Sequence, residues 1–435
     1  MNDASGTVSF AKDVAPILSK KCFKCHSADK PKGGFQLHTF DLLLKSGDSK
    51  SSPIIPTDPA RSELYRRLTT TVAEDRMPQK DDPLPRNQIE LIERWIKEGA
   101  RFDGPDAKAQ LVTLIPREPY SDPPAAYRFA IPVTALAFNP EGKELAVGGY
   151  HEITVWDPAD GKSLRRITNV AQRISALAYH PNGSVLAAAG GAPGQFGEAA
   201  LYDPIQGRLI RTLGAATDQM LALCFSPDAT RVAVGGADNA IRVYDAASGK
   251  EELVIQQHAD WVMALAFSRD GRRLASASRD RSARVYDAKT GELETSYNEH
   301  GAPVLAVEFD EDGQRVFSAG KDKKIHIWAV ADAKKSGEIT GFGGDVTKLL
   351  VEGRNLFSAS TDKVIRQHDT SDRKLIRNYS GHKDWAYALA SHPRTQRLAT
   401  ASHDGEVRVW NTENGSQTAA FVAAPGLLTV SRKSP

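Results

Sequence analysis

Apolar and polar residues alternate with two different periods along this chain. Before residue 104, apolar residues recur three or four positions apart in two stretches, which predicts two amphipathic helices, the second ending at Gly99. After residue 130, short apolar runs separated by turn residues predict strands instead. The apolar faces of the two helices comprise Phe10, Val14, Ile17 and Leu18, and Ile89, Ile92, Trp95 and Ile96.

Seven segments of the second region repeat one plan. Each has an apolar strand such as 133–138, a turn containing Pro, Asp or Gly, a strand of small residues, a second turn, and a strand with a characteristic ending. These endings are 46, 42, 42, 42, 40 and 42 residues apart, within the period of about 40 to 45 residues of WD40 blades. Residues 131–422 therefore resemble WD40 repeats, which implies an all-β, seven-bladed propeller. The endings are Trp156-Asp157, Tyr202-Asp203, Tyr244-Asp245, Tyr286-Asp287, Trp328-Ala329, His368-Asp369 and Trp410-Asn411.

The WD40 resemblance implies that a buried network of His, Ser or Thr, Asp and Trp stabilises each blade. Blades 1, 2, 3 and 6 depart from this pattern. Each blade is complete in chain order, so the ring needs no strand exchange, although residues 427–430 could add a closing strand. We expect the glycine-rich stretch 190–197 to be an extended loop. The matching residues are His258, Asp280 and the variant Tyr286 in blade 4, His300, Asp322 and Trp328 in blade 5, and His382, Asp404 and Trp410 in blade 7.

Residues 22–26 read Cys-Phe-Lys-Cys-His, the C-x-x-C-H pattern for covalent attachment of a c-type haem. On one helical turn, two thiols separated by two residues reach the two vinyl groups of one porphyrin edge. His26 then lies under the iron as its proximal ligand. A zinc site would need two further soft ligands, and the only other histidine before residue 104 is His38. A redox dithiol would need a βαβ context, which the pattern does not show.

A six-coordinate iron needs a second axial ligand, commonly methionine, which raises the reduction potential. Apart from Met1, the region before residue 104 contains one methionine, Met77, in a polar stretch rich in Pro and Asp. No apolar periodicity there explains Met77 as a core residue. Met77 is therefore the expected distal ligand, with His38 as the main alternative and an open site as the third.

Several motifs of the first region closely resemble the planctomycete-type cytochrome c domain. The resemblance covers most of residues 9–103 and implies a covalent haem through Cys22 and Cys25, with His26 and Met77 as axial ligands. It also implies export from the cytoplasm, although residues 1–10 show no signal peptide. We expect a periplasmic or otherwise exported bacterial protein, shown here in a mature form with a replacement Met1. The matching motifs are Val14-Ala-Pro-Ile-Leu18, Cys22–His26, Gly33-Gly-Phe-Gln-Leu37, Ser62-Glu-Leu64, Arg76-Met-Pro78 and Trp95-Ile-Lys-Glu-Gly-Ala100.

These patterns predict a multidomain chain. A small all-α cytochrome c domain occupies residues 1–103, a linker containing several prolines occupies 104–130, and the all-β seven-bladed propeller occupies 131–435.

Composition excludes several classes of function. The chain has 435 residues, 40% of them hydrophobic and 25% charged, and a net charge of +2. That balance argues against nucleic acid as an obligate partner. No apolar run approaches the ~18 to 20 residues that would cross a bilayer. The third cysteine, Cys224, lies in an apolar run and is expected to act as a small core residue.

Two groups of residues are candidates for docking a redox partner. Lysines cluster around the haem attachment segment, where they would attract an acidic protein, unless they simply form a solvated face. Trp261 and Trp385 precede the inner strands of blades 4 and 7, which places them at one rim of the propeller, where each anchors a partner or packs against a neighbouring blade. The lysines are Lys20, Lys21, Lys24, Lys30 and Lys32.

The expected function is transfer of single electrons by one haem c, because an iron held by His and Met has no open position for a substrate. The propeller would dock a partner protein or organise a complex. In the alternative, the chain is a periplasmic oxidoreductase, or a subunit of one, whose propeller holds a second active site while the cytochrome relays electrons. A redox or haem-dependent sensor, or an assembly protein, is a third possibility. The sequence favours a carrier over an enzyme, because the propeller's histidines show no metal-binding spacing beyond their structural positions.

Overall fold

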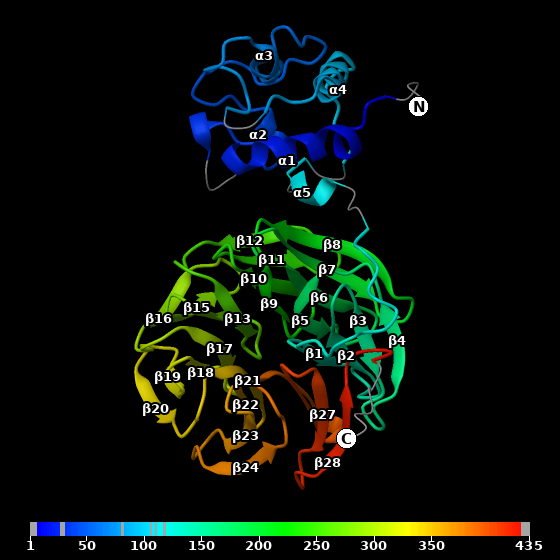
Figure 1. Cartoon of the computed structure of the whole chain (residues 1–435). Helices are drawn as coiled ribbons and strands as arrows, with labels where there is room; N and C mark the ends of the chain where they lie inside the picture. Colours follow the sequence, from blue (N-terminus) through cyan, green and yellow to red (C-terminus); the bar gives the residue numbers. More distant parts are fainter. Residues whose placement is uncertain are drawn as a thin grey trace. The chain divides into compact units, whose positions relative to one another are not determined.

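The computed structural model describes residues 7–26, 31–79, 82–104, 107–108, 111–115 and 119–427. The chain forms two compact units, residues 1–118 and 119–435. The described part of the first unit contains short helices (Figure 1). They are η1 (Phe10–Val14), α1 (Ala15–His26), η2 (Lys32–Gly34), α2 (Phe40–Leu43), α3 (Glu63–Thr69), α4 (Arg86–Lys97) and α5 (Leu111–Leu114).

The first helical segment begins at a polar cap and is held by aromatic packing. The Ser9 hydroxyl accepts a hydrogen bond from the N–H of Lys12 at 3.0 Å, and the Asp13 carboxylate accepts one from the N–H of Ser9 at 2.8 Å. These bonds satisfy N–H groups that lack partners at a helix start. The ring of Phe10 then lies 5.2 Å from the ring of Trp95 in α4, and both side chains are buried.

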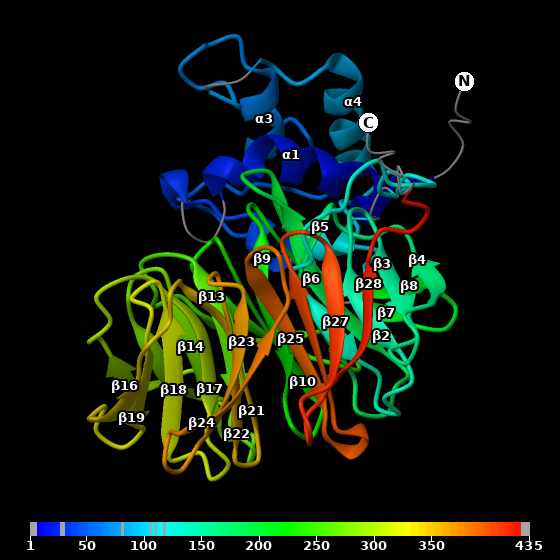
Figure 2. The ribbon, with the colours of Figure 1, turned by 60° about the horizontal axis from the view of Figure 1, so that its bottom comes forward.

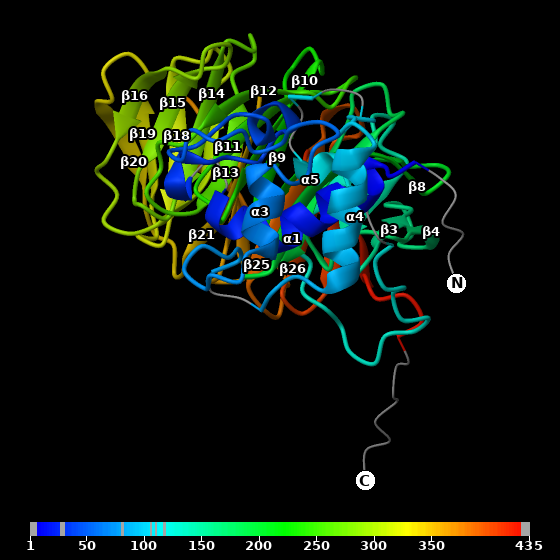
Figure 3. The same ribbon diagram turned by 90° about the horizontal axis from the view of Figure 1, so that it is seen from above.

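The two ends of this unit are also joined by hydrogen bonds. The Glu98 carboxylate accepts from the N–H of Val8 at 2.6 Å, and the Asp103 carboxylate accepts from the N–H of Ala11 at 2.9 Å. Helices α3 and α4 contact each other on one side of α1, and α5 contacts α1 from the other side (Figures 1 and 3). Helices from both ends of the unit therefore share one core.

The second unit is a seven-bladed β-propeller, and its described residues form seven four-stranded antiparallel sheets around a central axis (Figures 1 and 2). The seven blades predicted from the repeat period are thus confirmed. Blades 1 to 4 comprise β1 (Leu136–Phe138), β2 (Leu145–Gly148), β3 (Ile153–Trp156) and β4 (Ser163–Ile167); β5 (Arg173–Tyr179), β6 (Leu186–Ala192), β7 (Phe196–Asp203) and β8 (Arg208–Ala216); β9 (Met220–Phe225), β10 (Arg231–Gly236), β11 (Ile241–Asp245) and β12 (Glu251–Ile255); and β13 (Val262–Phe267), β14 (Arg273–Ser278), β15 (Ala283–Asp287) and β16 (Leu293–Tyr297).

Blades 5 to 7 follow the same order, with a short 3-10 helix, η3, inside blade 7. They comprise β17 (Val304–Phe309), β18 (Arg315–Gly320), β19 (Ile325–Ala329) and β20 (Lys335–Ile339); β21 (Val346–Glu352), β22 (Asn355–Ser360), β23 (Val364–Asp369) and β24 (Leu375–Ser380); and β25 (Ala386–His392), η3 (Pro393–Thr395), β26 (Arg397–Ser402), β27 (Glu406–Asn411) and β28 (Gln417–Val422).

The stretch 190–197 differs from its prediction as an extended loop. Strands β6 and β7 stay paired as far as Ala192 and Phe196, so this stretch lengthens a hairpin. Its glycines permit close backbone contacts: a Cβ on Gly190 would lie 2.0 Å from the carbonyl oxygen of Arg173, and one on Gly197 would lie 2.1 Å from that of Asp218. The glycines therefore serve the packing of neighbouring backbones rather than the flexibility of a loop.

The segment predicted to be a linker, 104–130, divides between the two units. Leu111 is fully buried in the core of the first unit. Tyr120 belongs to the propeller, where its N–H donates to the Asn169 side chain at 3.0 Å. The Tyr127 hydroxyl donates to the fully buried Glu152 carboxylate at 2.5 Å, and Glu152 also pairs with Arg166.

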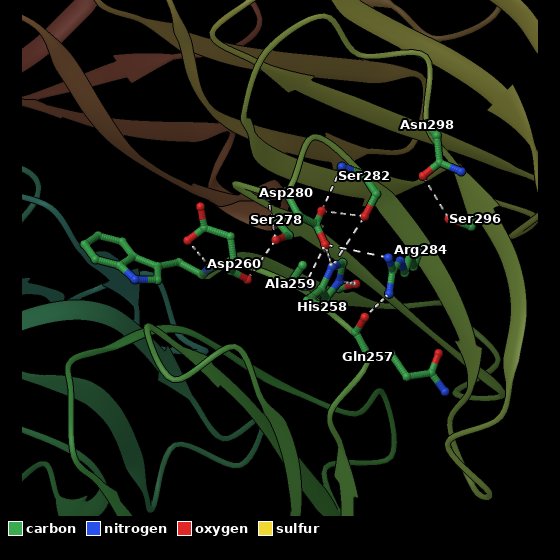
Figure 4. A network of polar contacts seen from close by, with 12 residues as sticks. Gln257, His258, Ala259, Asp260, Ser278, Asp280, Ser282, Arg284, Ser296 and Asn298 are labelled. Atoms are coloured by element: carbon green, nitrogen blue, oxygen red, sulfur yellow. Dashed lines mark hydrogen bonds and ion pairs between the residues drawn. The ribbon is translucent and has the colours of Figure 1, made fainter. Parts of the chain in front are cut away.

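The polar networks predicted for blades 4 and 5 are present. In blade 4, His258 Nδ1 donates to Asp280 at 2.8 Å, and His258 Nε2 lies 2.6 Å from the Ser276 hydroxyl (Figure 4). Burial alone would raise the pKa of Asp280, but hydrogen bonds from His258 and Ser282 hold that pKa well below its ordinary value. In blade 5 the same chain of contacts is complete, because the Trp328 ring N–H donates to Ser318, whose hydroxyl lies 2.8 Å from His300 Nε2.

Blade 7 departs from the expected network at its aspartate. His382 Nε2 lies 2.7 Å from the Thr400 hydroxyl, which also accepts from the Trp410 ring N–H at 2.9 Å. Asp404, however, accepts hydrogen bonds from the Ser402 hydroxyl and the N–H of Glu406 and makes none with His382. His382 is therefore buried without the carboxylate hydrogen bond that His258 and His300 possess, and the Glu406 carboxylate lies 4.0 Å from its Nδ1.

The ring closes without exchange of strands among the described residues, as the repeat order predicted. Side chains join blade 7 to blade 1 instead: the rings of Trp156 and Phe421 stack 4.6 Å apart, and Arg397 donates to the carbonyl of Gly142 at 3.0 Å. Leu427 lies outside any strand, and the rest of the proposed closing strand, residues 428–430, lies outside the described residues.

We expect the propeller to lose stability on acidification because two buried histidines resist protonation. Burial, aided by the charge of Arg408, lowers the pKa of His382 from 6.5 to about 4, and burial together with Arg366 lowers the pKa of His368 to about 4. Below pH 6.5 the unfolded chain binds protons that the folded chain excludes, so the stabilisation is complete above that pH and is lost as the pH falls towards 4. The expected loss in free energy of unfolding is on the order of 3 kcal/mol for each histidine.

Urea unfolding at pH 7 and pH 4.5 measures this loss. The variant His382→Gln should show a smaller difference between the two pH values than the unchanged protein. The matched control is His403→Gln, since the His403 side chain is 48% exposed. If the free energy of unfolding depends equally on pH in all three proteins, buried His382 is not a cause of the loss of stability in acid.

Candidate functional site

The first unit contains a cavity of about 980 Å³ that brings the sequence-predicted site residues together. Cys22, Cys25 and His26 reach it from the last turns of α1, and Met77 reaches it from the loop between α3 and α4. Pockets for small molecules and cofactors usually measure about 300 to 1,000 Å³, so the volume suits a large planar group. The apolar lining comes from Phe35, Leu37, Pro53, Leu64, Leu68 and Pro78.

One hydrogen bond orients His26. Its Nδ1 lies 3.2 Å from the carbonyl oxygen of Phe35. A carbonyl oxygen only accepts, so Nδ1 carries the proton and Nε2 keeps its lone pair for a metal ion. Burial lowers the pKa of His26 despite this bond, which favours the neutral imidazole that metals bind.

The segment that carries Phe35 is held by close backbone contacts. The N–H of Leu37 donates to the carbonyl of His26 at 3.0 Å, and the N–H of Asp48 donates to that of Gly33 at 2.7 Å. A Cβ on Gly47 would lie 2.4 Å from the carbonyl oxygen of Gly33. Only glycine at position 47 therefore permits the approach that supports the His26 contact.

The two cysteines of the motif are free thiols. Burial, with a smaller contribution from Cys25, raises the pKa of the Cys22 thiol from 9.0 to about 12. A protonated thiol is a poor nucleophile. Cys224 lies in β9 and packs against the core that blades 3 and 4 share, in agreement with its interpretation as a small core residue.

The structure separates the two candidates for a distal ligand. Met77 is half-buried and lines the cavity, and its N–H donates to the carbonyl of Arg67 at 2.8 Å. His38 is half-buried but is not among the described residues that line the cavity. The arrangement of side chains therefore favours Met77.

Charges of both signs surround the cavity. Lys20, Lys21 and Lys32 line it together with Asp48 and Glu63. The side chain of Lys24 and the whole of Lys30 lie outside the described residues.

The two candidate rim tryptophans have similar surroundings. In blade 4, Arg279 lies over the half-buried Trp261 ring, 4.2 Å from its centroid, and Asp260 accepts from the N–H of Trp261 at 2.8 Å. In blade 7, Trp385 is 49% exposed, and its N–H donates to the neighbouring aspartate at 2.8 Å. Trp385 is thus the more accessible of the two. The stacking of Arg279 was not predicted, because no local sequence pattern marks a cation that lies beside a ring 18 residues away.

Two groups of histidine and acidic side chains occur among the described residues of the propeller. Within each group, one possible ligand atom per residue lies within 4.8 Å of the others. All of these residues belong to blades 5 and 7, where His300, Asp322 and His382 occupy positions of the structural networks described above. The groups are His300, Asp322 and His326, and His382, Asp404 and Glu406.

Comparison with known proteins finds a different family model matching part of each unit. A family model described as planctomycete cytochrome C matches residues 22–81. A model described as WD domain, G-beta repeat, matches residues 207–245, 249–287, 291–329 and 373–411. No helix in the described part of the chain has the length and apolar character needed to cross a membrane.

Relatives among characterised proteins match only a short part of this chain. The kinesin-like protein KIF21B of Homo sapiens is 39% identical over 67 residues, which are 15% of this chain and 4% of that protein. Eukaryotic translation initiation factor 3 subunit I of Aspergillus terreus is 36% identical over 68 residues, 16% of this chain and 20% of that protein. The chain thus spans a fifth or less of the length of these relatives. Residues 22–81 are therefore similar to planctomycete cytochrome C, and residues between 207 and 411 carry WD40 repeats within a seven-bladed β-propeller.

Proposed function

We propose that the first unit is a c-type cytochrome that carries one haem, bound covalently through Cys22 and Cys25, and that it transfers single electrons. His26 and Met77 are the axial ligands of this proposal. The propeller docks a partner protein, and the chain works in the periplasm or another exported location of a bacterium. The match to planctomycete cytochrome C supports the first part, and the WD40 repeats support the second.

One observation carries the proposal: the three residues of the attachment motif and Met77 line the same cavity. The attachment residues come from α1 and Met77 comes from a loop more than 50 residues later. A motif that matched by chance would have no reason to face a methionine across an apolar cavity. The tautomer of His26 adds to this support, since its Nε2 is free for a metal ion.

The proposed group would supply a centre that gains and loses one electron, and the chain's own residues set its surroundings. His26 and Met77 would both bind the iron, which would leave no open position there for a substrate. The thioether sulfur of Met77 raises the reduction potential relative to a second histidine. The apolar lining excludes water, which also affects the potential.

The propeller's part in the proposal rests on its accessible rim. Trp385 is half-exposed, and large aromatic side chains are common anchors of protein interfaces. The lysines at the cavity would favour an acidic surface on the redox partner.

Haem attachment can be tested by producing the full chain with an export signal in a bacterium that has the haem c maturation system. We expect one haem per chain that survives denaturing electrophoresis, measured by haem staining and intact mass. The double variant Cys22→Ala/Cys25→Ala should lack it, and the control Cys224→Ala should keep it. A chain without covalent haem, or haem retained by the double variant, would exclude the proposal.

The distal ligand can be tested with Met77→Ala. We expect covalent haem to remain, the reduction potential to fall, and added imidazole to bind the iron at least ten times more tightly, because it no longer competes with Met77. Voltammetry and absorption titrations measure these changes, with Met263→Ala in β13 as the control. If His38→Ala produces them and Met77→Ala does not, the assignment of Met77 is wrong.

A further inference from the structure

The loop that carries Met77 has no buried anchor of its own. Every residue from 70 to 79 is half-buried or exposed, and Val72 is 52% exposed. A second cavity, of about 290 Å³, is lined by residues of this loop and of α3. Apolar packing therefore contributes little to the position of the loop, and polar contacts must hold it in place.

Those polar contacts converge on one residue of α3. The Arg67 guanidinium donates to the Asp75 carboxylate at 2.8 Å and lies 3.3 Å from the carbonyl oxygen of Asp75, and the carbonyl of Arg67 accepts from the N–H of Met77. Among the described residues, every hydrogen bond that joins residues 71–79 to a residue before Thr70 ends on Arg67. The remaining bonds of the loop stay within it or reach Thr70.

A contact within α3 also holds the guanidinium of Arg67 in place. Its Nε donates to the Glu63 carboxylate, one helical turn earlier, at 2.8 Å. The side chains of Glu63 and Arg67 are 16% and 34% exposed, so the pair is partly shielded from water. Charge-assisted hydrogen bonds in such surroundings are stronger than those between neutral groups.

We propose that Arg67 is the positioning residue for Met77: through Glu63 and Asp75 it holds the loop against α3 so that the methionine sulfur stays directed into the cavity. This proposal rests on the proposed function, because it assumes that Met77 is an axial ligand. Arg67 acts through the loop and not by donating to the iron.

The proposal has a measurable consequence for the iron. A ligand such as imidazole binds only when Met77 has left, so its apparent affinity is proportional to the fraction of molecules with an open site. Loosening the loop increases that fraction. We expect Arg67→Gln to tighten imidazole binding about tenfold and to lower the reduction potential towards that of Met77→Ala, with the same content of covalent haem.

The matched control is Arg66→Gln, the neighbouring arginine, whose guanidinium pairs with Glu63 and, among the described residues, makes no hydrogen bond with residues 71–79. It should bind imidazole as the unchanged protein does. Asp75→Asn tests the same link from the other side and should also tighten binding, and the double variant Arg67→Gln/Asp75→Asn should add little to either single change. Asp75→Asn also keeps the test decisive if Arg67→Gln does not fold.

The outcomes separate the two proposals. If Met77→Ala tightens imidazole binding but Arg67→Gln and Asp75→Asn do not, Arg67 does not position the ligand. If Arg67→Gln acts and Asp75→Asn is silent, Arg67 works by a direct contact with the haem, and the positioning role is also wrong. If Met77→Ala itself changes neither affinity nor potential, the ligand assignment of the proposed function fails first.

Discussion

The propeller depends on one constraint: the central strands of each blade bury both of their faces. Almost every residue of β14 and β22 is buried, although successive residues of a strand point to opposite sides. A sheet with two apolar faces must be covered twice, and each blade receives that cover from the blades before and after it. The core shared by blades 3 and 4 illustrates this, because Ile241 and Val243 of β11 pack with Leu265 of β13. The seventh blade must then meet the first, since any end blade would leave an apolar face in water.

The helical unit differs from the propeller, because its apolar core lies beside a cavity of about 980 Å³. Phe10, Phe40 and Trp95 pack together and give α1 a firm base, so the residues at its far end enter the cavity from a rigid wall. The Met77 loop forms another wall of the cavity, and its hydrogen bonds to the helix before it end mainly on Arg67. The two walls of the cavity are therefore unequal: apolar packing fixes one, and a few charged contacts fix the other. In the cytochrome that we propose, covalent attachment would depend on the packed side, and the strength of the distal ligand would depend on the charged contacts.

The features that the sequence predicted are those with a local signature. The blade period, the two amphipathic helices and the Cys-x-x-Cys-His motif each appear as a spacing within a short window. The sequence placed Met77 in a polar stretch, but the residue that we propose to hold this stretch was not found, because Arg67 resembles an ordinary surface residue of an amphipathic helix. The same limit applies to Asp404, whose turn towards Ser402 has no counterpart in the repeat pattern. The stretch 190–197 was predicted to be a loop and proved to lengthen a hairpin, because glycine clusters are typical both of loops and of close backbone contacts.

The order of strands within the ring has a consequence for how such a protein can change over generations. Each described blade is formed by one continuous stretch of chain. A single duplication or deletion of about 42 residues would therefore add or remove a whole blade. In this chain the joint between the first and last blades includes stacked side chains such as Trp156 and Phe421. Point substitutions can adapt such a joint to a new number of blades one residue at a time.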